Sequence, residues 1–187
     1  MFRFFLNGPF RNSMLKTDGK RLEASGEKSG SAFSSRDPVF LGGLAGSFGI
    51  LTRDGYSFLA KTIGLAKFYV WNISAGLFME RKYVNTFFGN TVGILADIVL
   101  GAVIGIVFVY FIKFTNHKNF LIKAWGIGMA AWLLLFGIVF HSLPGTDHLA
   151  PQEALSNLSA FIGHSIFGIS IGIYAQILLK RFGVVDR

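Results

Sequence analysis

One segment of this chain, residues 87–112, holds a single charged residue, Asp97. A bilayer core about 30 Å thick is crossed by roughly 20 helical residues. The part that follows Asp97, residues 98–112, carries no charge at all before Lys113. An uncharged run in a segment of this length is typical of a membrane-spanning helix, so the chain is expected to be an integral membrane protein.

The composition agrees with this prediction. Of 187 residues, 52% are hydrophobic and only 15% are charged, whereas a soluble domain has about 25% charged residues. The apolar residues stand in long blocks, which predict spans over residues 39–63, 87–112, 121–141 and 155–179. The expected fold is therefore all-α, a polytopic membrane helix bundle of about four transmembrane helices over residues 37–183.

The first span is the least regular. Asp37 and Pro38 are suited to the N-cap and the first helical position, but Arg53 and Asp54 interrupt the apolar segment. The span requires either that this charged pair lies inside it or that the helix breaks near Gly55.

A shorter apolar stretch, residues 67–79, cannot cross a bilayer. Tyr69 and Trp71 within it, with Lys and Arg close by, favour a short interfacial helix.

The ends of the chain are expected in the cytoplasm. Residues 1–36 are basic and poor in large apolar residues from Asn12 onward, which predicts a disordered basic cytoplasmic tail. With four spans, thirteen Lys and Arg residues would lie on the side of the termini and four on the other, or six against four without the tail. Positive charge is enriched in cytoplasmic loops, so the expected localisation is the cell membrane, multi-pass, with both termini cytoplasmic.

Small residues recur every four positions in the second span. Residues at this spacing share one face of a helix, and glycine there permits close helix packing. Asp97 is part of this stripe and should point into the protein. The fourth span has a similar stripe that includes His164. The candidate helix-packing glycines of the two spans are Gly89, Gly93, Gly101, Gly105, Gly168 and Gly172.

Three ionisable residues on separate spans, Asp54, Asp97 and His164, are expected at similar depth, roughly 4 to 6 Å outward of the midplane at 1.5 Å per residue. Ionisable groups inside a membrane are costly and mark candidate functional sites. We therefore expect a polar intramembrane site that opens outward. The alternative is structural: Asp97 and His164 would hydrogen-bond each other and fix the helix register.

Three further residues, His141, Asp147 and His148, are expected at the outer mouth of this site. Zinc sites use three or four ligands of these types, but the spacing here matches no zinc motif, so no metal is expected. The chain has no cysteine, which excludes disulfides and thiolate chemistry.

The last helix carries one resemblance. The stretch from His164 to Gly172, with a His, an aromatic residue and two glycines in a His-x-x-aromatic-Gly-x-x-x-Gly pattern, resembles the last helix of several small uncharacterised multi-helix bacterial inner-membrane protein families. The resemblance covers about nine residues. It implies a bacterial inner membrane and no catalytic activity.

Signatures of enzymes and of nucleic-acid binding are lacking in this sequence. Ser165 stands beside His164, but adjacent residues on a helix point apart, so a membrane hydrolase is the least favoured class. The leading expectation is a non-enzymatic accessory or scaffolding membrane protein, and the alternative is a small transporter or channel component. The expected partners are the lipid bilayer and either a second copy or another membrane protein, with no nucleic acid, catalytic residue or cofactor.

Overall fold

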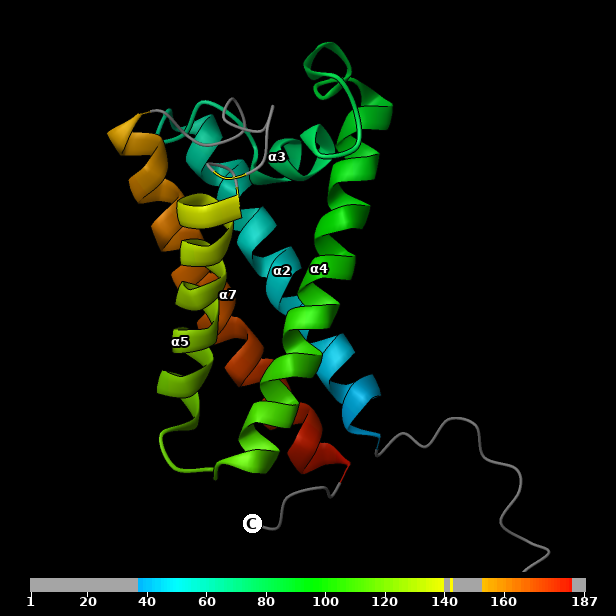
Figure 1. Cartoon of the computed structure of the whole chain (residues 1–187), viewed down its shortest axis with the longest axis vertical. Helices are drawn as coiled ribbons and strands as arrows, with labels where there is room; N and C mark the ends of the chain where they lie inside the picture. Colours follow the sequence, from blue (N-terminus) through cyan, green and yellow to red (C-terminus); the bar gives the residue numbers. More distant parts are fainter. Residues whose placement is uncertain (1–36, 140–141, 143–152, 183–187) are drawn as a thin grey trace, which may run out of the picture. The chain divides into compact units, whose positions relative to one another are not determined.

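Helices make up every regular element in the residues that this computed structural model describes, 37–139, 142 and 153–182 (Figure 1). This confirms the all-α class. The predicted tail, residues 1–36, and the predicted mouth residues His141, Asp147 and His148 lie outside the described residues.

The elements follow one another with short connections. They are α2 (Pro38–Thr62), α3 (Val70–Gly76), the 3₁₀-helix η1 (Arg81–Tyr83), α4 (Phe87–Phe114), α5 (Phe120–Trp132), the π-helix η2 (Leu133–Val139) and α7 (Ala154–Arg181). Three helical segments are long and apolar enough to cross a membrane: Phe87–Phe114, Phe120–Val139 and Ala154–Arg181. They support a membrane helix bundle. The first expected span corresponds to α2, which is not among these three.

Local sequence explains where α2 begins and how it continues. Asp37 caps it, because its Oδ1 accepts a hydrogen bond from the Val39 N–H at 2.8 Å, and proline stands in its first turn. The helix runs without a break through Arg53, Asp54 and Gly55 to Thr62. Of the two possibilities for this segment, the structure therefore has the charged pair inside a continuous helix.

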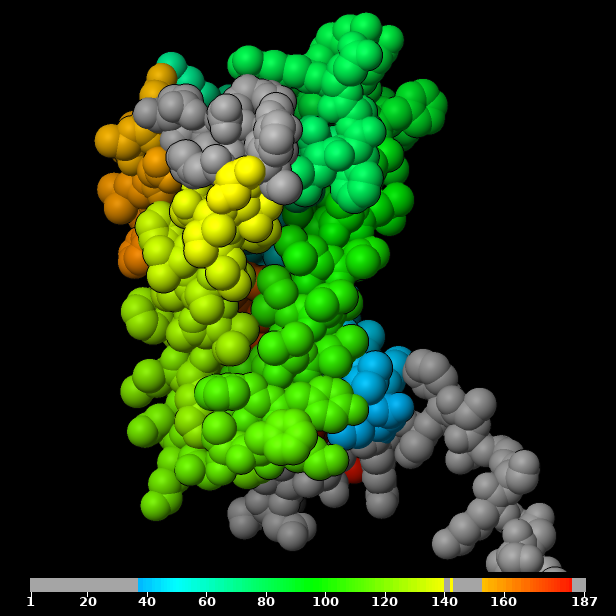
Figure 2. All heavy atoms as spheres, in the orientation of Figure 1, coloured from blue at the N-terminus to red at the C-terminus, as the bar shows by residue number. Residues whose placement is uncertain are grey.

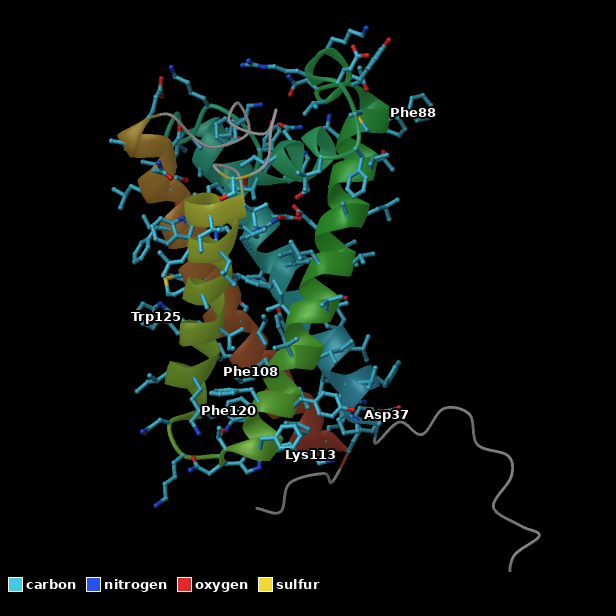
Figure 3. All side chains as sticks on the ribbon, in the orientation of Figure 1. Asp37, Phe88, Phe108, Lys113, Phe120 and Trp125 are labelled. Carbon is cyan, nitrogen blue, oxygen red and sulfur yellow. The ribbon has the colours of Figure 1, made fainter. Side chains whose placement is uncertain are left out.

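The helices pack in a chain of pairs. Extensive contacts join α2 to both α4 and α7, and α5 to α7 (Figure 1). By contrast, α4 and α5 make few contacts although a short turn connects them. Phe108 and Phe120 meet edge to face near that turn, with ring centroids 5.1 Å apart (Figure 3). Figure 2 shows α4 and α5 forming most of one face of the molecule, with little of α2 and α7 visible between them.

Glycines allow the closest of these approaches. A Cβ atom added to Gly46 would lie 1.9 Å from the Gly101 carbonyl oxygen, and one added to Gly105 would lie 2.1 Å from that of Gly42. A Cβ on Gly168 would lie 2.7 Å from the Ala124 carbonyl oxygen. The backbones of α2 and α4, and those of α5 and α7, therefore touch where a side chain would not fit.

The helix α4 has two different faces. The residues that recur at every fourth position, Asp97 among them, are all buried. Large apolar side chains on another face of the same helix are exposed: Leu95, Val99, Val103 and Val107. An apolar face of this kind is suited to lipid or to another membrane protein.

Candidate functional site: a buried cluster around Arg53

Arg53 is the centre of a charged cluster at the junction of α2, α3 and α4. Its side chain donates to Asp54 Oδ1 twice, from Nε at 3.1 Å and from Nη2 at 2.8 Å. Nη2 also donates to Asp97 Oδ2 at 2.5 Å. Arg53 is only 2% exposed and Asp97 0%. One guanidinium thus joins two acids that come from different helices, and all three side chains are buried.

Asp97 also binds the short helix α3. The Ser74 hydroxyl donates to Asp97 Oδ1. Both carboxylate oxygens of Asp97 therefore accept a hydrogen bond, one from α2 and one from α3. Because the carboxylate sits in the glycine stripe of α4, Asp97 ties α2, α3 and α4 together.

Neighbouring polar contacts hold α3 against α4 and so position Ser74. The Asn72 side-chain amide donates to the Val84 carbonyl at 3.2 Å and to Asn90 Oδ1 at 2.9 Å. Trp71 Nε1 donates to the same Asn90 oxygen at 2.8 Å. A Cβ on Gly93 would lie 2.1 Å from the Trp71 carbonyl oxygen, so α3 rests directly on the backbone of α4.

Only one of the two carboxylate oxygens of Asp54 accepts hydrogen bonds from the described residues. Oδ1 receives both hydrogen bonds from Arg53, whereas Oδ2 is buried without a hydrogen-bond partner among the described residues. The side chain as a whole is 8% exposed. An unsatisfied polar atom inside a protein is costly, which makes this oxygen the most unusual atom of the cluster.

His164 lies beside the cluster and is not bonded to it in the part of the chain that the structure describes. It is 1% exposed, and its Nδ1 is 2.8 Å from the Ala160 carbonyl oxygen, one turn earlier on α7. Because a carbonyl oxygen can only accept, Nδ1 carries the hydrogen. The ring meets Phe136 of η2 edge to face, with centroids 5.3 Å apart.

The backbone next to His164 nevertheless approaches Arg53. A Cβ added to Gly163 would lie 3.5 Å from Arg53 Cγ. The structure thus brings Asp54 and Asp97 together through Arg53, and it places His164 one residue from the point where α7 contacts the arginine stem.

The candidate site predicted from the sequence did not include two members of the cluster, Arg53 and Ser74, although a pairing of Arg53 near Asp54 was one possibility. Arg53 had a usable signal, because a buried arginine in an apolar helix needs an acidic partner, and two acids were already expected at this depth. Ser74 had no such signal, since a single serine in a short helix does not indicate which helix it will face.

Metal binding has no candidate group here: the described residues contain no cluster of three His, Asp or Glu side chains that could hold an ion.

A second feature is a groove of about 490 Å³ between the end of α5, η2 and α7. Its lining is mainly apolar and consists of Trp132, Leu133, Phe136, Gly137, Asn157, Leu158 and Phe161. Trp132 Nε1 is buried without an acceptor among the described residues, and the Trp132 ring meets Phe161 edge to face at 5.4 Å.

Compared with family models, with curated proteins and with solved structures, the chain matches none.

Proposed function

We propose that this chain is an integral protein of the cell membrane with four spans and a non-enzymatic accessory or scaffolding role. The observation that carries the proposal is the burial of the Arg53 cluster. A transport site or an active site has to present polar groups to a solute or substrate, whereas Arg53 and Asp97 bind each other and are only 2% and 0% exposed. Their placement between helices is suited to fastening a bundle.

The arrangement around Ser165 supports a non-enzymatic role. A serine nucleophile needs a base within hydrogen-bond reach, about 2.6–3.2 Å. The Ser165 hydroxyl instead accepts from Trp125 Nε1 at 3.3 Å and lies 3.7 Å from Met129 Sδ. Both partners are on α5, while the His164 Nδ1–H points to the Ala160 carbonyl oxygen.

The burial of the charged pair also supports α2 as the fourth span. The helix has 25 residues, which at 1.5 Å each corresponds to about 37 Å. The two charged residues in its middle, Arg53 and Asp54, are buried, and its third charged residue, Lys61, lies in the last turn. Charged groups inside a membrane are tolerated where they pair and face the bundle interior.

Charge at the helix ends supports cytoplasmic termini. The described Lys and Arg residues near the α4–α5 turn and the end of α7 are Lys113, Lys118, Lys123, Lys180 and Arg181. Those near the opposite end are Lys61, Lys67, Arg81 and Lys82. The end with the α4–α5 turn thus has only a small excess of positive charge. The basic residues in 1–36, which precede α2, enlarge this excess.

The exposed face of α4 is the surface on which a scaffold would meet its partner. To test this, a photo-reactive amino acid is placed at Val103, which is exposed, and separately at Phe108, which is buried on the same helix. We expect protein cross-links in native membranes from position 103 and none from position 108. Adducts with lipid alone at position 103 would contradict a scaffolding role.

The second candidate, a small transporter or channel component, is favoured by the unpartnered Asp54 Oδ2. It is tested with the full chain reconstituted in phospholipid vesicles. Under our proposal, proton and potassium permeability equals that of protein-free vesicles. A flux that disappears in Asp97→Asn would contradict the accessory role and favour transport.

A further inference from the structure

With both acids ionised, the cluster would have a net charge of −1. Arg53 contributes one positive charge, whereas Asp54 and Asp97 would contribute two negative charges if both were ionised. All three side chains are at most 8% exposed. An uncompensated charge in an interior of low dielectric constant is strongly unfavourable, and a buried group commonly takes or releases a proton instead of remaining charged.

The hydrogen bonds indicate which acid can be neutral. Asp97 accepts on both oxygens, from Arg53 and from Ser74, so its ionised form is well supported. Asp54 accepts only on Oδ1, and Oδ2 has no donor among the described residues. An ionised Asp54 would therefore leave half of its charge on an atom without any stabilising contact.

From this arrangement we infer that Asp54 is a proton-binding site, with one proton held on Oδ2. The cluster then contains Arg53 as the cation, Asp97 as the anion and Asp54 as a neutral acid. Oδ1 of the protonated Asp54 still accepts from Arg53, so proton binding leaves every hydrogen bond described above in place. The inference depends only on the burial and pairing of the cluster, and it stands whether or not the scaffolding role is correct.

A metal ion fits this place less well than a proton. Hard cations require several oxygen ligands, and Asp54 Oδ2 is the single unused carboxylate oxygen of the cluster. No group of three His, Asp or Glu side chains in the described parts of the chain could hold an ion. A proton needs one oxygen only.

Among the described residues, few other groups near Asp54 could hold this proton. Arg53 and Asp97 are its charged neighbours on α2 and α4 in this part of the chain, and α3 and η2 have no titratable side chain. On α7 the nearest titratable group is His164, whose Nδ1 hydrogen is already bound to the Ala160 carbonyl oxygen. The carboxyl group of Asp54 is therefore the proton site that the geometry favours.

Infrared spectroscopy tests the inference on the full chain in lipid nanodiscs. A protonated carboxylic acid has its own carbonyl stretch, which a carboxylate lacks. We expect this band at neutral pH in the unmodified protein. We also expect it to vanish in Asp54→Asn, which removes the acid, and in Asp97→Asn, which leaves Arg53 and an ionised Asp54 as a neutral pair. The matched control is Asp37→Asn at the exposed start of α2, which should keep the band.

The outcomes that overturn the inference are specific. Absence of the band in the unmodified protein means that no buried acid is protonated. Persistence in Asp54→Asn assigns the proton to another residue, and persistence in Asp97→Asn shows that charge balance does not govern the site. Circular dichroism shows whether Asp54→Asn folds. If it does not, the inference is still tested by the band in the unmodified protein and by its expected loss in Asp97→Asn but not in Asp37→Asn.

Discussion

Arg53 of α2 donates to Asp97 of α4 across 2.5 Å, between Gly101, which packs against α2, and Gly93, which packs against α3. The glycines bring the backbones together, and the ion pair links the side chains just beyond them. Close packing holds helices together where no hydrophobic force draws them together. Loss of one partner of a buried ion pair is costly, because the other charge is left uncompensated.

Removal of Arg53 should be far more damaging than neutralisation of Asp97. Arg53→Met leaves two buried acids without a cation, and loss of one partner of a buried pair costs about 3–5 kcal/mol. Asp97→Asn keeps Arg53 paired with Asp54 and should cost about 1–2 kcal/mol. Unfolding in mixed detergent measures both. Lys180→Met, which removes an exposed cation from α7, serves as control, and equal losses for Arg53→Met and Lys180→Met would contradict the role of the cluster.

The glycine interface predicts opposite effects for two glycines of one helix. Gly46→Ala places a Cβ 1.9 Å from the Gly101 carbonyl oxygen and should destabilise the bundle by about 1–3 kcal/mol. Gly55 has nothing within 4 Å of its Cβ position, so Gly55→Ala should be neutral or should stabilise α2 by up to about 1 kcal/mol. The same unfolding measurement compares them. A Gly46→Ala protein as stable as the Gly55→Ala protein would rule out the close contact of α2 and α4.

Ser74 and Asp97 should be energetically coupled. A double-mutant cycle with Ser74→Ala and Asp97→Asn should give an interaction free energy of about 0.5–3 kcal/mol, as for residues in direct contact. A second cycle pairs Ser74→Ala with Asp37→Asn at the start of α2, where we expect additivity within about 0.5 kcal/mol. Additivity in the first cycle would mean that α3 is not held by Asp97.

The His164 ring should show a single tautomer. Since Nδ1 donates to the Ala160 carbonyl oxygen, nitrogen NMR of histidine-labelled protein should show a protonated Nδ1 at this residue. His117 lies in the exposed turn between α4 and α5 and provides the comparison for a solvated ring. An unprotonated Nδ1 at His164 would contradict the hydrogen bond.

Membrane crossing by α4 can be tested with single cysteines, because the chain contains none of its own. Lys82→Cys lies before α4 and Lys118→Cys lies after it. A membrane-impermeant maleimide added to intact cells should label position 82 and leave position 118 unlabelled until the membrane is opened. Labelling of both positions in intact cells would contradict this crossing.

Much of the helical architecture could be predicted from the sequence, because its signals are local. The uncharged run after Asp97 predicted α4, and the Asp37-Pro38 pair predicted the start of α2, where the cap is present. The four-residue spacing around Asp97 also predicted the inward direction of its side chain, which is 0% exposed. Each of these inferences needs only helix periodicity and the cost of charge in an apolar environment.

Which acids Arg53 contacts could not be predicted, because this depends on how α2 is rotated against α4. Arg53 precedes Asp54 directly and would ordinarily point elsewhere on the helix, yet its long side chain reaches both acids. The position of Ser74 depends on the packing of α3 against Gly93, and the π-helical turns of η2 arise where Phe136 meets His164. These are contacts between distant segments, for which a single sequence contains no spacing signal.

The most direct test of the central claim is a distance measurement between Arg53 and Asp97 in a lipid bilayer. Solid-state NMR of protein labelled with ¹⁵N in arginine side chains and ¹³C in aspartate carboxyl groups detects such contacts, and Asp54→Asn isolates the contribution of Asp97. We predict a guanidinium–carboxyl coupling that persists in Asp54→Asn and is lost when Asp97→Asn is added. A folded, helical protein without this coupling in the Asp54→Asn background would contradict the account.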